Sequence, residues 1–167
     1  MLRLGVVVLA TAAVCMPSEA SGQTLDFDPP GAPAIGDFTP VTLTGGRQLS
    51  SLSIAPFTVT DATLSLAGWH VVLTVPDLVN GASMIPASAI LMDAPVVTAV
   101  GGADITGVAG HPATGNLAAG ENIVTADAGG GDGSYLVSPS FATLEIPVTA
   151  IAGTYASAAS MSVVSGP

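Results

Sequence analysis

The feature that most constrains this chain is a period-two alternation of apolar residues in the stretch from Leu49 to Pro76. In one set of alternate residues Trp69, the single tryptophan, is followed by Val71, Leu73 and Val75. The other set consists of His70, Val72 and Thr74. Successive side chains of a strand point to opposite faces, so this pattern predicts a strand with Trp69 on its core face. We read the whole stretch as a β-hairpin.

The first arm of this hairpin changes parity in its middle. Leu52 and Ile54 share one face, whereas Phe57 and Val59 have the opposite parity. Both pairs can point inward only if the chain slips by one residue at Ala55–Pro56. We therefore predict a β-bulge there, on a strand that tolerates proline.

Further alternating segments indicate more strands, and no segment has the period of an amphipathic helix. The expected strands are Phe38–Thr44, Ile85–Met92, Pro95–Val100, Ala142–Val148 and Tyr155–Val163. Residues 77–83 are expected to form a loop with an Asn-Gly turn, and residues 101–133 a long glycine-rich loop with one short strand at Ile123–Val124. Many short strands with Gly and Pro turns predict an all-β antiparallel β-sandwich of the immunoglobulin-like or Greek-key type.

The amino terminus has the composition of a secretory signal peptide. Arg3 precedes an apolar run from Leu4 to Met16, and small residues follow at Ser18 and Ala20. We expect cleavage after Ala20 or within the next two residues, and the run is too short to span a bilayer. The predicted organisation is a signal peptide at 1–20, an extended linker at 21–37 and one β-sandwich domain at 38–167.

Charge and cysteine content exclude several functions. Beyond residue 20 the sequence has Arg47 as its single cation against eleven acids, and it has no lysine and no cysteine. Nucleic-acid binding is excluded, because the chain has almost no cations to neutralise phosphates. Catalysis through a Schiff base or a Ser-Lys pair is excluded, because lysine is absent. The domain must fold without disulfides, which suits a bacterial secreted domain.

Candidate site residues are few. Trp69 could be a sugar-stacking platform, but its parity favours the core; His70 and His111 are read as solvated side chains, because a zinc site needs three or four ligands. The stretch Asp127–Ser134 is superficially like a calcium loop, yet it has two carboxylates and no EF-hand spacing, so we expect a solvated loop.

No motif of a known nucleophile, zinc hydrolase or phosphate loop is present. We expect no catalytic residue, no cofactor and no metal, although a glycosidase pair among the acids stays a weak alternative.

Five short motifs, taken in order, resemble the WxL family of bacterial cell-surface proteins. They are Asp61, Gly68-Trp69, Ile85-Pro86-Ala87-Ser88, Glu145-Ile146-Pro147-Val148 and Ala152-Gly153-Thr154-Tyr155. The chain departs from the family at Trp69-His70-Val71, where the family has Trp-x-Leu, and it lacks a second tryptophan.

The resemblance implies a secreted, non-enzymatic β-sandwich that associates non-covalently with the cell wall, with a wall polymer or other surface proteins as partners. The alternative is a structural subunit of a surface fibre or layer that self-associates by strand-edge pairing, since the final strand is rich in Ala and Ser.

Overall fold

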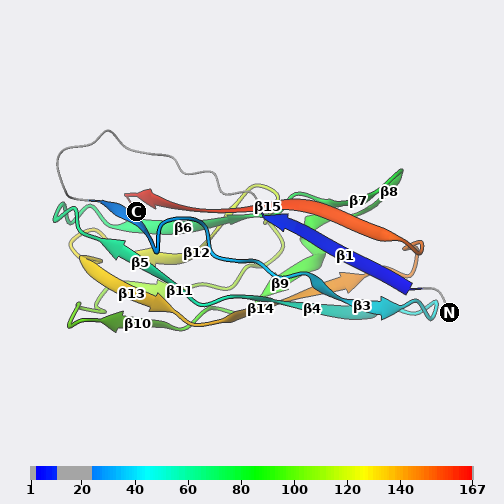
Figure 1. Cartoon of the computed structure of the whole chain (residues 1–167), viewed down its shortest axis with the longest axis horizontal. Helices are drawn as coiled ribbons and strands as arrows, with labels where there is room; N and C mark the ends of the chain where they lie inside the picture. Colours follow the sequence, from blue (N-terminus) through cyan, green and yellow to red (C-terminus); the bar gives the residue numbers. More distant parts are fainter. Residues whose placement is uncertain (1–2, 11–23, 167) are drawn as a thin grey trace.

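The computed structural model describes the backbone of residues 3–10 and 24–166, and the side chains of residues 24–166. The described residues form strands and one short 3-10 helix, so the chain is all-β, as predicted (Figure 1). The elements are β1 (Arg3–Ala10), β2 (Leu25–Asp28), β3 (Phe38–Thr42), β4 (Gln48–Ile54), β5 (Phe57–Asp61), β6 (Trp69–Thr74), β7 (Leu78–Asn80), β8 (Ser83–Ile85), η1 (Ala87–Ala89), β9 (Ile90–Met92), β10 (Val97–Val100), β11 (Val108–Gly110), β12 (Glu121–Ala126), β13 (Gly133–Val137), β14 (Ser140–Ile146) and β15 (Thr154–Ser165).

These strands form three sheets. The largest has the order β11-β12-β6-β15-β1-β3, and β7 and β8 extend it beside β15. The two smaller sheets have the orders β10-β13-β5-β2 and β4-β14-β9. Pairing is antiparallel throughout the described strands, apart from β1, which runs parallel to β15. The antiparallel sheets agree with the predicted β-sandwich.

The two smaller sheets are successive parts of one long ribbon. Phe57 pairs with Val137, and Ile54 pairs with Ser140. The same number of residues separates these positions on both strands, so the pairing register continues across the interruption. Both strands change parity here, and each has a proline at the break, Pro56 and Pro139. Neither proline can donate a ladder hydrogen bond, which explains why pairing stops at this point.

This geometry corrects two predictions. Leu52, Ile54, Phe57 and Val59 all point inward, as expected, but no β-bulge produces this, because neither strand carries an extra residue. The hairpin from Leu49 to Pro76 is also wrong, since β6 pairs with β12 and β15 instead of β5. Alternation alone shows which face is buried and does not select the pairing partner.

Other segments differ from expectation in the same way. Residues 101–133 contain two strands, and the short strand expected at Ile123–Val124 is part of the six-residue β12, which pairs with both β6 and β11. The expected loop at 77–83 is the hairpin β7–β8, which turns at Gly81. The 3-10 helix η1 interrupts the strand expected at Ile85–Met92. Within the expected linker, Leu25–Asp28 forms β2 and pairs with β5.

The expected signal peptide is described only in part. Arg3–Ala10 forms β1, whereas the remainder of residues 1–20 lies outside the described residues. The signal peptide therefore stays a prediction. Among the described residues, no helix is long and apolar enough to cross a membrane.

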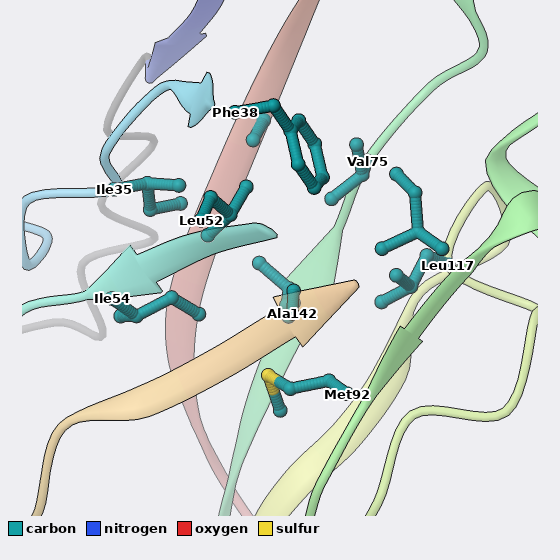
Figure 2. Close-up of a pocket in the computed structure, with 11 residues that line it drawn as sticks. Ile35, Phe38, Leu52, Ile54, Val75, Met92, Leu117 and Ala142 are labelled. Carbon is teal, nitrogen blue, oxygen red and sulfur yellow. The ribbon is translucent and has the colours of Figure 1, made fainter. Parts of the chain in front are cut away.

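One apolar core joins the sheets. Trp69, Val71, Leu73 and Val75 are all buried, which confirms the predicted core face of β6. The inward residues of β5, β13 and β14 belong to the same cluster, so the large sheet and the ribbon share a core. The core contains a small apolar space of about 20 Å³, into which Phe38, Val75 and Leu117 point (Figure 2). A space of this size with an apolar lining is a packing gap and not a ligand site.

Candidate functional site

Trp69 holds a glycine-rich loop that lines the candidate site. Its side chain is fully buried, its indole N–H donates to the carbonyl oxygen of Gly131 at 2.8 Å, and its ring centroid is 5.6 Å from that of Tyr135. Gly131 has a φ of +82°, and a Cβ there would lie 2.6 Å from the indole nitrogen. Only glycine fits this position, so Trp69 fixes the path of the loop as well as filling the core. The sequence-based assignment of Trp69 to the core is confirmed.

Tyr135 joins this loop to a second one. Its hydroxyl lies 2.8 Å from the carbonyl oxygen of Asp104 and 2.9 Å from that of Asp132, and its one hydrogen is shared between them. Burial raises the pKa of Tyr135, and the negative charges of Asp104, Asp132 and Asp61 raise it further. The neutral hydroxyl is thereby favoured, which keeps the bridge between the two loops intact.

The two loops enclose an open hollow of about 340 Å³ at one end of the sandwich, which we call the acidic hollow. Its lining consists of three aspartates, glycine backbone and a few small or apolar side chains: Leu66, Asp104, Thr106, Gly107, Asp127, Ala128, Gly129, Gly130, Gly131, Asp132 and Tyr135. This volume is within the range of about 300–1,000 Å³ that is typical of small-molecule sites.

The carboxylates of the hollow differ in their surroundings. Asp104 accepts the backbone N–H of Thr106 at 2.9 Å, and hydrogen bonds from Thr106 lower the pKa of its carboxyl group. Oδ1 of Asp132 is enclosed and has no hydrogen-bond partner among the described residues. The exposed carboxylate of Asp104 can therefore accept hydrogen bonds from a ligand, whereas the enclosed Oδ1 of Asp132 faces protein.

The acidic hollow corrects the expectation of a simple solvated loop at Asp127–Ser134. Gly131 is buried, and Asp132 is half-buried. Within the described part of the chain no three acidic, histidine or cysteine side chains are grouped closely enough to hold a metal ion. The sequence analysis did not identify Asp104. Only the fold brings it beside Asp127 and Asp132, which lie more than twenty positions later in the chain.

The two histidines lie elsewhere and do not form a site together with an acid. His70 Nδ1 is 2.8 Å from the carbonyl oxygen of Gly166, and His111 Nε2 is 2.8 Å from the hydroxyl oxygen of Thr125. Both side chains are half-buried and hydrogen-bonded, so they are partly rather than fully solvated.

The motifs that resemble the WxL family fall mainly in the core. Trp69, Ile85, Ile146 and Tyr155 are each at most 1% exposed. Asp61 is buried as well, and its carboxylate accepts the backbone N–H of Thr63 at 2.8 Å and the hydroxyl of Thr63 at 2.6 Å. These residues therefore support the fold and do not form the lining of the hollow. Comparison with protein-family models finds none that matches this chain, and no curated protein matches it either.

Proposed function

We propose that this chain is an exported bacterial surface protein that acts by non-covalent binding, with the acidic hollow contacting neutral glycan of the cell wall. The chemistry of the hollow supports this proposal. Carboxylate oxygens accept hydrogen bonds from sugar hydroxyls, and the small glycine residues beside them leave room for a ligand. The loops that carry these groups are held by buried Trp69 and Tyr135, so the hollow is formed before a ligand arrives.

Electrostatics favour a neutral glycan over an anionic polymer. The chain has a formal net charge of −10. Among residues 24–166 the one basic side chain of fixed charge, Arg47, is ion-paired with Glu145. A polyanion would therefore meet repulsion at the hollow, whereas uncharged sugar hydroxyls carry no such penalty.

A pull-down on isolated cell walls tests this proposal. The exported chain should be retained without added divalent cations, and the double variant D104N/D132N should bind about tenfold more weakly, because charged hydrogen bonds contribute about 1.5 kcal/mol or more. The double variant D28N/D93N removes two exposed charges outside the hollow and is the matched control.

Two outcomes contradict the proposal. One is the absence of wall retention with or without divalent cations. The other is stronger retention of D104N/D132N than of the unmodified chain, which would mean that general charge repulsion dominates and that the hollow makes no specific contact.

The second candidate function is assembly into a surface fibre or layer through strand-edge pairing. The observation that favours it is β15, a twelve-residue strand without charge or proline. Beyond Ala159 this strand has no ladder partner on the side of β1 among the described residues, and an unpaired strand edge can pair with another chain.

A further inference from the structure

Strand β1 lies between β15 and β3 in the large sheet and is the only described strand that joins them (Figure 1). Gly5–Ala10 pair with Thr154–Ala159 of β15 in a parallel ladder. Arg3–Val6 pair with Phe38–Thr42 of β3 in an antiparallel one. Neighbouring strands are about 4.8 Å apart, so without β1 the sheet would have a gap about 10 Å wide, which is the space that one strand occupies.

Strand β3 is attached to β4 independently of β1. Thr39 Oγ1 donates to the carbonyl oxygen of Ser51 at 3.1 Å, and Ser50 Oγ donates to the carbonyl oxygen of Thr39 at 2.5 Å. Gln48 Nε2 donates to the carbonyl oxygen of Thr42 at 2.6 Å. These bonds oppose a shift of β3 onto β15, so loss of β1 would leave the gap open.

An open gap would expose apolar side chains and unpaired backbone. Phe38 of β3 and Tyr155 and Ala159 of β15 are at most 1% exposed with β1 in place. The backbone groups of Thr154–Ala159 that face β1 would also lose their partners. An unpaired strand edge of this kind is a template for a strand from another chain.

We propose that removal of the signal peptide opens this gap and that an extended segment of another surface protein inserts into it, as a strand parallel to β15. The inference rests on the proposed export, because cleavage after Ala20 removes β1. Strand β1 shows what the gap accepts, since it occupies the gap before export. Backbone hydrogen bonds to both neighbouring strands would hold the inserted segment.

A different protein fits the gap better than a second copy of this chain. Because β3 lies beside the gap and β2 also contacts β15, a single strand can enter and the edge of a second sheet cannot. In a second copy without β1, every other described strand is paired within a sheet or, in the case of β3, attached to β4. Two copies would also repel each other, since both are strongly acidic. The partner is therefore a protein with an unpaired extended segment.

The register of β1 defines the chemistry of that segment. Val6 and Val8 are level with Tyr155 and Ser157 of β15, whose side chains are buried. The inserted strand therefore needs apolar residues at these alternate positions, whereas polar residues fit between them. Strand β1 begins at Arg3, and a basic residue there suits a chain with a formal net charge of −10.

Binding of a peptide to the exported chain tests the proposal. The probe is a fluorescent synthetic peptide with the sequence Arg3–Ala10, and fluorescence anisotropy measures its affinity. It should bind the exported chain at least about tenfold more tightly than the full chain expressed without export, whose gap β1 already fills. Mass spectrometry of the exported chain shows whether the signal peptide has been removed.

Two variant peptides test the register with matched changes. The V6N/V8N peptide places amides level with buried residues of β15 and should bind about tenfold more weakly or worse, because a buried amide without a partner is unfavourable. The V7N/L9N peptide places the same amides level with Ala156 and Ala158, which are exposed, and should bind like the unmodified peptide. Equal affinities of the two variant peptides overturn the proposed insertion.

Hydrogen exchange locates the bound peptide. In the exported chain alone, the amides of Thr154–Ala159 that face the gap should exchange rapidly, and the peptide should protect them. The amides of Ser160–Ser165 that pair with β6 should be protected in both states and are the internal control.

Slow exchange of Thr154–Ala159 without the peptide contradicts the proposal in either of two ways, which sedimentation separates. In a monomer it means that β3 has closed onto β15 and that no gap exists. In a dimer it means that a second copy fills the gap, which overturns the assignment to a different protein.

A variant of the full chain covers the case in which the signal peptide is retained on export. V6P/V8P removes two backbone donors from β1 and should expel it from the gap, whereas V6T/V8T keeps both donors. Circular dichroism establishes that the remaining strands are intact. V6P/V8P should then bind the peptide at least about tenfold more tightly than V6T/V8T.

These measurements separate the insertion from the proposed export. If the signal peptide is retained and V6P/V8P binds the peptide, the proposed export fails and the strand insertion stands. If the cleaved chain or a folded V6P/V8P chain does not bind the peptide, the insertion is overturned. A retained signal peptide together with a V6P/V8P chain that unfolds also overturns it, because β1 is then a permanent part of the fold. A failed wall pull-down has no bearing on the peptide assays, since they use purified protein.

Discussion

Replacing Trp69 by phenylalanine tests the central packing arrangement. The change removes the indole N–H that donates to Gly131 and leaves the buried carbonyl oxygen without that donor. An unsatisfied buried acceptor costs about 1–3 kcal/mol, and the smaller ring leaves a void beside Tyr135 that adds about 1 kcal/mol. We therefore expect a loss of about 2–4 kcal/mol in the free energy of unfolding.

Urea unfolding followed by far-ultraviolet circular dichroism measures this loss. The control is F141L, which shortens an aromatic side chain that is 62% exposed and should change stability by less than about 0.5 kcal/mol. Fluorescence of the unmodified chain adds an independent check, because Trp69 is the sole tryptophan and is 0% exposed. A W69F variant as stable as F141L, or an indole that acrylamide quenches freely in the folded chain, would refute the packing argument.

Two further predictions concern the same end of the molecule. The folded pKa of Tyr135 is raised, so its contribution to stability is complete below the unfolded pKa of about 10 and is lost as pH rises through the folded value. Stability should therefore fall in alkaline solution above about pH 10, and Y135F should flatten that fall in unfolding curves measured at a series of pH values. In G131A, the new methyl group would collide with the indole of Trp69 at a positive φ, so we expect a loss of more than about 2 kcal/mol in the same urea assay, whereas G45A, which has open space at a similar φ, should lose about 1 kcal/mol. Equal losses for G131A and G45A would mean that backbone strain alone accounts for the effect.

The acidic hollow illustrates what sequence reasoning could reach. Asp127 and Asp132 were identifiable because they flank a run of glycines, and Trp69 could be assigned to the core from its parity. Asp104 could not be linked to them, since nothing in the spacing shows that Tyr135 bridges the two loops. The long loop expected at 101–133 concealed β12, because its inward residues Ile123 and Val124 are adjacent and break the alternation; the register shift between Asn122 and Val124 accounts for this.

The sequence by itself determined the all-β class, the inward faces of β6 and β15, and the poverty of the chain in cations and thiols. These properties depend on residue type and on a period of two along the chain, both of which are local. Only the tertiary structure decided that β6 pairs with β12 and β15, that two prolines interrupt one ribbon, and that three aspartates share a hollow. Most strand partners in this fold are far apart in sequence, and an alternating strand fits many partners equally well, so the choice among them is made when the whole core packs.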